Sequence, residues 1–270
     1  MSIFWIASYL ALGACSGVLA GMLGIGGGIV LVPALALMFA AQTAFPPAET
    51  LHLALGTSMA SIIFTALASI RTHQAHAAIR WDIVKTITPG ILVGTGLGSL
   101  LAASVPARPL AIFFTAFVYI VAIQMALNLK PKPTRELPGP AGVAGVGLGI
   151  GTLSALVAIG GGSLTVPFLA WCNVRIQHAI GTSAAVGLPI AIGGSIGYVF
   201  NGWGEHAMPA GSLGFVYLPA LVVLVLATML MAPIGARLAH RLPVLTLKRL
   251  FAGILILLAT KMLLSLLNAP

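Results

Sequence analysis

The chain has 270 residues, of which 59% are hydrophobic and only 6% are charged, and its formal net charge is +9. A soluble domain carries about 25% charged residues, so this composition excludes a water-exposed globule and predicts a chain solvated by the lipid bilayer. The basic residues lie between hydrophobic runs rather than in a patch, so no nucleic-acid partner is expected. Retention of basic loops on the cytoplasmic side explains the excess charge.

Ten hydrophobic runs follow one another along the chain. They lie near residues 3–23, 29–41, 51–70, 83–104, 109–128, 139–159, 163–172, 178–200, 213–235 and 249–268. A helix needs about 20 apolar residues to cross the hydrocarbon core, so runs 29–41 and 163–172 are too short and are predicted to be broken or re-entrant helices. The expected fold is an all-α integral membrane protein with about 8–10 membrane segments.

A set of glycine motifs occurs twice. Residues 25–28 (Ile-Gly-Gly-Gly) precede Val32 and Pro33, and they recur 134 positions later as residues 159–162, which precede Val166 and Pro167. The other matched pairs keep the same order: Gly13 and Gly17 with Gly147 and Gly151, residues 56–58 (Gly-Thr-Ser) with residues 181–183, and, 137 positions apart, Gly98 and Pro106 with Gly235 and Pro243. The sequence therefore predicts a duplication.

The duplication divides the chain into two membrane repeats, residues 1–129 and 141–270. Residues 130–140 (KPKPTRELPGP) join them and are predicted to form an exposed cytoplasmic connector, because proline cannot continue a helix and proline-rich segments stay solvated.

Charge in the loops predicts the orientation. Eleven basic residues fall on one predicted face: Arg71, Arg80, Lys85, Lys130, Lys132, Arg135, Arg175, Arg237, Arg241, Lys248 and Arg249. Only Arg108 falls on the other, so the first face is predicted to be cytoplasmic and both termini outside. Loop 71–82 is basic whereas its counterpart 201–212 has no Lys or Arg, and the bias is reversed between loops 104–109 and 236–248. Opposite bias in equivalent loops predicts an inverted repeat, as in many secondary transporters.

The paired glycine breaks are the predicted binding site. Glycine lets backbone approach a ligand closely, and a helix that begins at a break points free N–H groups and its positive dipole end toward it. Two such breaks that meet near the midplane would hold an anion. The alternative is that these glycines only allow close helix packing.

Hydroxyl groups in the Gly-Thr-Ser motifs are expected to join this site, although they also commonly bond to a preceding carbonyl. The predicted substrate-binding residues are Gly26, Gly27, Gly28, Thr57, Ser58, Gly160, Gly161, Gly162, Ser163, Thr182 and Ser183.

Four further polar residues are secondary candidates. Gln124 and Lys261 lie 137 positions apart in the apolar last span of each repeat. Lys261 either snorkels to the interface or acts as a counter-charge to the anion. His52 and His178 precede the two Gly-Thr-Ser motifs and either titrate near neutral pH or are merely interfacial.

The four carboxylates of the chain all fall in loops or at the edges of spans: Glu49, Asp82, Glu136 and Glu205. A buried carboxylate proton relay is therefore not expected. No metal site and no cofactor are predicted.

These duplicated Gly-Gly-Gly…Val-Pro and Gly-Thr-Ser motifs, with the Gly-x-x-x-Ala-x-x-Leu-Pro stretch of residues 235–243, resemble the TauE/SafE sulfite exporter family over essentially the whole chain. The resemblance implies a bacterial inner-membrane permease that moves sulfite, sulfonates or related sulfur-containing organic anions, often as an exporter.

The function expected from the residues is secondary transport of a small anion by alternating access, with a proton or sodium ion as a coupling ion and a homodimer allowed. A passive anion channel is an alternative on the same fold. An intramembrane enzyme is disfavoured, because the chain has no His-Glu-x-x-His motif and no paired membrane aspartates. Nucleotide-driven pumping is disfavoured because no Gly-x-x-x-x-Gly-Lys-[Ser/Thr] loop occurs.

Overall fold

The structure, a computed structural model, describes residues 2–23, 27–128, 133–205, 208–239 and 244–268. Helices and one short hairpin make up its regular elements. In chain order they are α1 (Ile3–Leu23), α2 (Gly28–Ala40), α3 (Thr50–Ala75), α4 (Trp81–Ser104), α5 (Ala107–Ala126), α6 (Pro140–Val157), α7 (Gly162–Trp171), α8 (Ile176–Asn201), β1 (Ser212–Leu213), β2 (Val216–Tyr217), α9 (Leu218–Ala239) and α10 (Val244–Asn268).

Seven helices among the described residues are long and apolar enough to cross a membrane, which confirms the predicted class of all-α integral membrane protein. The helices α2 and α7 have only 13 and 10 residues, as the two short runs predicted. Three runs differ from the helices by five residues: the run near 213–235 begins with the hairpin and α9 starts only at Leu218, whereas α3 continues to Ala75 and α10 already starts at Val244. Gly211 and Gly214 have positive φ angles of 89° and 54°, which turn the chain before α9.

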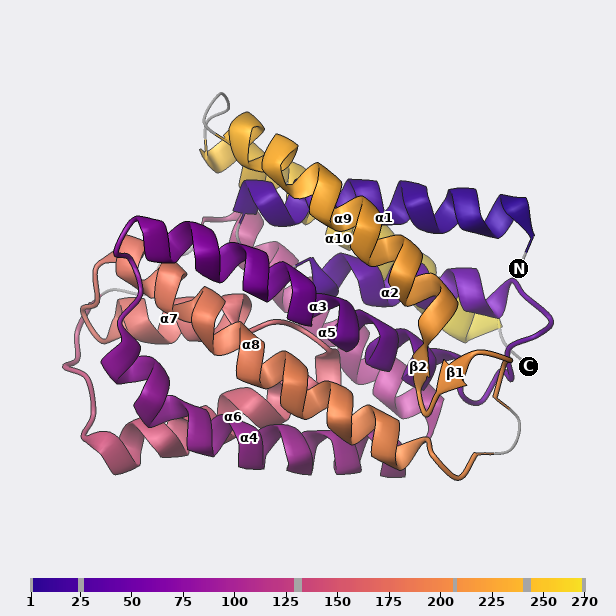
Figure 1. Cartoon of the computed structure of the whole chain (residues 1–270), viewed down its shortest axis with the longest axis horizontal. Helices are drawn as coiled ribbons and strands as arrows, with labels where there is room; N and C mark the ends of the chain where they lie inside the picture. The colour runs from indigo at the N-terminus through magenta and orange to yellow at the C-terminus, as the bar shows by residue number, and fades with distance from the viewer. Residues whose placement is uncertain (1, 24–26, 129–132, 206–207, 240–243, 269–270) are drawn as a thin grey trace.

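Two pairs of helices form opposite long edges of the molecule. Figure 1 shows α1 and α9 along one edge and α4 and α6 along the other, with α3 and α8 between them. The connections 76–80 and 172–175 lie at one end, whereas the chain termini and the β1–β2 hairpin lie at the opposite end. In the same view α3 runs from right to left and α8 runs from left to right.

Glycine allows the closest helix contacts. A Cβ atom added at Gly94 of α4 would overlap the carbonyl oxygen of Leu148 in α6. On the other edge, a Cβ atom at Gly17 of α1 would lie 2.7 Å from the carbonyl oxygen of Thr228 in α9. Membrane helices have little hydrophobic driving force for association, so backbone approach at small residues supplies the packing.

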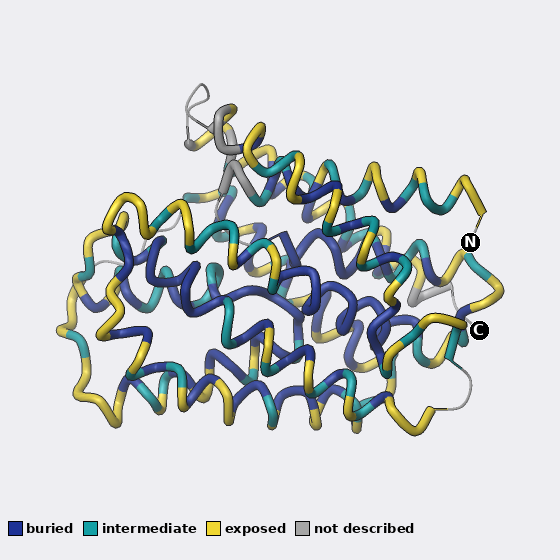
Figure 2. Tube along the Cα trace, viewed as in Figure 1, coloured by how far each residue is buried: buried dark blue, intermediate teal, exposed yellow. Residues whose placement is uncertain are grey.

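Burial follows the same arrangement. Figure 2 shows that the buried segments lie between the two edges. Large apolar side chains on the outside remain exposed, among them Ile120 at 65%, Phe200 at 76% and Leu230 at 71%. Apolar surface on this scale marks an interaction surface, and on spans of this length it fits contact with lipid.

The described part of the Pro-rich connector, residues 133–139, is non-helical and largely exposed. The indole N–H of Trp171, the last residue of α7, donates a 2.9 Å hydrogen bond to the Thr134 hydroxyl. The connector is therefore attached to the end of the second short helix. Residues 130–132 of the predicted connector lie outside the described residues.

Candidate anion-binding site

Both short helices begin at the predicted glycine breaks. α2 starts at Gly28, and its N-cap Gly27 has a φ of 63°, in the left-handed region that favours glycine. α7 starts at Gly162 after Gly161, and neither N-cap makes a side-chain capping hydrogen bond. The positive ends of both helices therefore point toward the breaks without a capping side chain. Gly26 lies outside the described residues.

The two breaks lie in contact in the buried core. A Cβ atom at Gly28 would lie 2.6 Å from the carbonyl oxygen of Ala158, which ends α6 just before the second break. Ile62 of α3 touches both breaks: its side chain would lie 2.7 Å from a Cβ at Gly28 and 3.1 Å from one at Gly160. From this meeting point α2 extends toward the end that holds the termini, and α7 extends toward the opposite end (Figure 1).

The threonines of the Gly-Thr-Ser motifs accept backbone hydrogen bonds from the other half of the chain. The Tyr217 N–H donates to the Thr57 hydroxyl oxygen at 2.9 Å, and the Arg80 N–H donates to the Thr182 hydroxyl oxygen at 3.0 Å. Both threonine side chains are fully buried. These oxygens therefore satisfy backbone N–H groups where α4 and α9 begin.

The serines of the same motifs differ from each other. The Ser58 hydroxyl donates to the carbonyl oxygen of Gly28 at 3.4 Å. The Ser183 hydroxyl is buried and has no hydrogen-bond partner among the described residues. The hydroxyls of Ser163 and Thr165, in the first turn of α7, likewise have no partner within the described part of the chain.

Thr165 was not among the predicted site residues. A signal for it exists in the sequence: the position 134 residues earlier is Leu31, so the repeat places a hydroxyl where the first half has an apolar side chain. A search for residues that are identical in the two halves does not find Thr165, because the halves differ at this position.

The secondary candidates lie elsewhere. Lys261 is exposed on α10, which fits the snorkelling alternative, and Gln124 is half-buried on α5. His52 is buried, and its Nε2 donates to the carbonyl oxygen of Ala102 at 3.0 Å. The His52 Nδ1 lies 3.2 Å from the Glu49 carboxylate. The structure does not bring these residues to the breaks.

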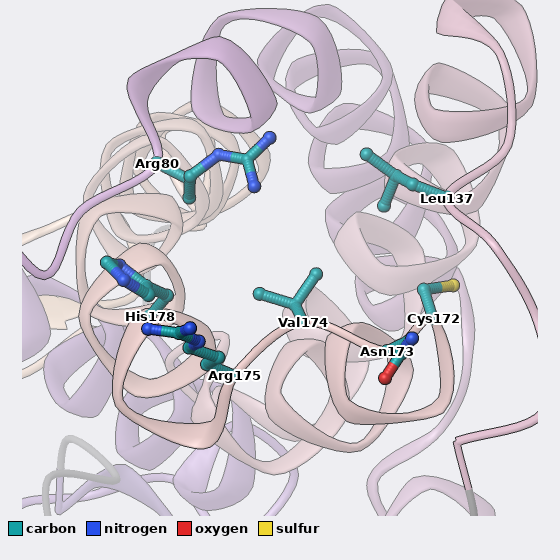
Figure 3. A pocket seen from close by; sticks show the side chains of 7 residues that line it. All are labelled: Arg80, Leu137, Cys172, Asn173, Val174, Arg175 and His178. Carbon is teal, nitrogen blue, oxygen red and sulfur yellow. The ribbon is translucent and has the colours of Figure 1, made fainter.

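His178 instead lines a cavity of about 360 Å³ where α4 and α8 begin. The lining residues are Arg80, Leu137, Cys172, Asn173, Val174, Arg175 and His178. Figure 3 shows the Arg80 guanidinium pointing toward the open space, with His178 and Arg175 below Arg80 on the same side and with Leu137 and Cys172 across from them. None of these described lining residues carries a carboxylate, but the Arg80 guanidinium is paired with Asp82 just outside the lining, so Arg175 supplies the positive charge that no described carboxylate compensates. We call this space the basic cavity.

The pKa values of two side chains that line the cavity, Arg80 and Cys172, are raised. The Arg80 guanidinium makes a two-pronged hydrogen bond to Asp82, at 2.9 Å and 2.5 Å, which raises the pKa of Arg80. Arg80 is therefore fully charged at any physiological pH. Burial raises the pKa of the Cys172 thiol, so this side chain stays neutral at neutral pH.

Comparison with known proteins assigns the class. The family model for the sulfite exporter TauE/SafE matches residues 9–262. A probable membrane transporter protein of Haemophilus influenzae is 36% identical over 255 residues, which cover 94% of this chain and 96% of the relative. The probable membrane transporter protein YdhB of Bacillus subtilis is 27% identical over 239 residues, covering 86% and 89%. No solved structure matches the chain.

The fold and these matches define a multi-pass membrane protein of a transporter family. The chain belongs to the sulfite exporter TauE/SafE family.

Proposed function

We propose that the protein is a secondary transporter for a small anion of the sulfite or sulfonate type, and that it works by alternating access in the bacterial inner membrane. One observation carries this proposal: two uncapped helix N-termini, those of α2 and α7, meet at glycine breaks in the buried core. Helix N-termini bind anions through free N–H groups and the helix dipole.

The core also lacks fixed negative charge in its described part. Apart from three tyrosines and Cys172, every buried polar side chain among the described residues is a serine, a threonine or His52. A buried carboxylate would repel an anion, whereas hydroxyl groups donate hydrogen bonds to it. Any coupling sodium ion is expected to be held by hydroxyl and carbonyl oxygens, and any coupled proton by a histidine or by the substrate itself.

Equivalent helix–helix contacts in the two halves support the duplication. Gly17 of α1 packs against the carbonyl of Thr228 in α9, and Gly151 of α6 packs against the carbonyl of Ile91 in α4. The two glycines lie 134 positions apart, and the two carbonyl residues lie 137 positions apart. These are the offsets at which the glycine motifs recur, so equivalent helices make equivalent contacts across the two halves.

Helix directions support the inverted relation. The equivalent helices α3 and α8 run in opposite directions in Figure 1. If the long axis of the molecule is the membrane normal, the halves are upside down relative to each other, and an exchange of conformations between them opens the site first to one side and then to the other. The end that holds the basic cavity is then cytoplasmic, and both termini lie outside.

The basic cavity is proposed to attract the anion before it reaches the helix breaks. Arg80 and Arg175 mark the beginnings of α4 and α8 at one end of the molecule. A recess lined by one sign of charge raises the local concentration of the opposite ion. Because Asp82 compensates the charge of Arg80, Arg175 is the lining residue that attracts anions to the proposed cytoplasmic mouth.

Purified protein in liposomes tests the proposal. Uptake of sulfite, a sulfonate and a carboxylate is measured against imposed proton and sodium gradients. The proposal predicts saturable flux of the sulfur oxyanions that responds to one gradient. Flux that is absent for every anion, or that never saturates, contradicts secondary transport.

A further inference from the structure

The two helix breaks are matched in sequence but differ in chemistry. The first turn of α2 presents Ile29 and Leu31, which are buried and apolar. The equivalent positions of α7, 134 residues later, are Ser163 and Thr165. Only the second break therefore has side-chain hydrogen-bond donors in the first turn of its short helix.

The space beside the two breaks also differs. Ile62 of α3 fills the space at Gly28 and Gly160. Its counterpart in α8, at the offset of 125 that relates the Gly-Thr-Ser motifs, is Gly187. A Cβ atom at Gly187 would meet only the backbone nitrogen of Gly161, at 3.8 Å. Ile62 therefore touches both breaks, and the Cβ position of Gly161 in the second break also lies 3.1 Å from Ile190 and 3.3 Å from Val186. The two breaks differ on the α8 side, where the second break faces Gly187, a residue without a side chain.

The free hydroxyls lie on that same side. Ser183 and Gly187 are one helical turn apart and share a face of α8, and Gly187 faces the backbone nitrogen of Gly161. The Thr165 hydroxyl lies 3.1 Å from the Cβ position of Gly161. Both hydroxyls are buried, with exposures of 0% for Thr165 and 2% for Ser183, and neither has a partner among the described residues.

A buried polar group without a partner is costly, and the fold tolerates it where a ligand supplies the missing bond. The corresponding serine of the first half, Ser58, already donates to the Gly28 carbonyl. The second break thus has two hydroxyl donors available beside the N-terminus of α7.

We propose that the anion binds at the second break alone, and that the first break is a structural plug closed by Ile62. The Gly161 N–H and the hydroxyls of Thr165 and Ser183 donate to the oxygens of a compact oxyanion head group, a sulfite ion or the sulfonate end of a larger molecule. Gly187 provides the room for that head group, so Thr165 and Gly187 determine specificity. This inference rests on the proposed function and names the half of the molecule that performs the binding.

Two substitutions test it. Thr165→Val removes a donor at nearly constant volume, and Gly187→Ala adds a methyl group where only one atom lies within 4 Å. Binding is measured as the shift in melting temperature with sulfite and with methanesulfonate, beside the KM for uptake of each anion. Leu31→Val, at the α2 position that matches Thr165, is the control.

Loss of a hydrogen bond to a charged group corresponds to about a tenfold or greater loss of affinity, and that loss is expected for Thr165→Val. Gly187→Ala is expected to keep the wild-type melting temperature without ligand, and to weaken the binding of methanesulfonate more than the binding of sulfite. Leu31→Val keeps wild-type affinity.

Wild-type affinity in both Thr165→Val and Gly187→Ala overturns the second-break site while leaving the proposed function intact. Equal loss of affinity in Leu31→Val also overturns it. Absence of binding and uptake in the wild-type protein overturns the proposed function, and this inference with it.

Discussion

The hydroxyl oxygen of Thr57 in α3 accepts a 2.9 Å hydrogen bond from the backbone N–H of Tyr217, which lies 160 residues later in the chain. Tyr217 ends the hairpin that precedes α9, so this bond ties the first Gly-Thr-Ser motif to the second half of the protein. Thr182 makes the equivalent bond to Arg80. Each threonine oxygen thus already accepts a structural hydrogen bond, and it would keep this bond while contacting a substrate.

Replacing Thr57 by valine removes the acceptor of a buried 2.9 Å hydrogen bond. Loss of one hydrogen bond costs about 0.5–1.5 kcal/mol, so Thr57→Val is expected to lower the melting temperature in detergent. Thr57→Ser keeps the hydroxyl and should recover most of the loss. An unchanged melting temperature together with a lost anion-induced shift would identify the hydroxyl as a ligand instead.

The two N-cap glycines are expected to respond differently to alanine. Gly27 has a φ of 63°, and left-handed backbone costs a residue with a Cβ roughly 1–2 kcal/mol. Gly27→Ala should therefore lower stability more than affinity. At Gly161, which has an ordinary φ of −38°, an added Cβ would lie 3.1 Å from the Thr165 hydroxyl, 3.1 Å from Ile190 and 3.3 Å from Val186.

Gly161→Ala should consequently weaken anion binding by about a decade, the loss expected for one charge-assisted hydrogen bond. Titrated anion-induced stabilisation of each variant is compared with its melting temperature without ligand. If Gly161→Ala loses stability while its anion-induced shift keeps the wild-type size, the second triplet is a packing element and the site assignment fails.

Topology is tested by labelling three exposed positions. Gly139 lies before α6, and Ala44 and Gly204 lie in exposed connections between helices. At Gly139 and Gly204 an added Cβ has no neighbour within 4 Å, so cysteine fits there. With the native cysteines replaced, a cysteine at Gly139 is expected to react with an impermeant maleimide only from the cytoplasm.

Cysteines at Ala44 and Gly204 are expected to react only from outside. Each sample is also labelled after the membrane is permeabilised, which controls for accessibility. Reaction of all three positions from the same side would contradict the inverted repeat.

Arg175 in the basic cavity is expected to affect anion capture. Arg175→Gln removes one positive charge from the cavity and should raise the KM for uptake severalfold at low ionic strength. The difference should shrink toward physiological salt and beyond, where the Debye length falls to about 8 Å and less. Arg135→Gln is the matched control, because Arg135 lies over the Trp171 ring at 5.1 Å and does not line the cavity. Equal effects of the two substitutions would mean that net charge, and not the cavity, attracts the anion.

The helices were predictable because apolar runs of the required length have few alternatives in a bilayer. The hairpin before α9 was missed because Phe215, Val216 and Tyr217 continue the apolar run into the helix. Their pairing depends on the glycine turns that surround them and on contact with α3, and neither appears in a hydropathy pattern.

The candidate site was predictable only in part. The glycine breaks were located because they repeat, whereas the partners of Thr57 and Thr182 are backbone N–H groups, which no side-chain motif marks. The basic cavity joins Arg80 with Arg175 through the approach of two helix ends. Sequence placed Lys261 inside the last span, and its exposure on α10 depends on which face of that helix packs inward.

Counterflow in liposomes separates alternating access from passive conduction. Vesicles that contain the purified protein are loaded with unlabelled sulfite and diluted into a trace of labelled sulfite, with no gradient of protons or sodium. The membrane potential is held at zero by valinomycin and equal potassium on both sides, because an unclamped potential would also drive the label through a channel. A transporter with alternating access exchanges the outgoing anion for the labelled one, so the account predicts that labelled sulfite rises transiently above its equilibrium level and then falls. Simple equilibration without an overshoot, in vesicles that do conduct sulfite, would show a passive channel and would contradict the account.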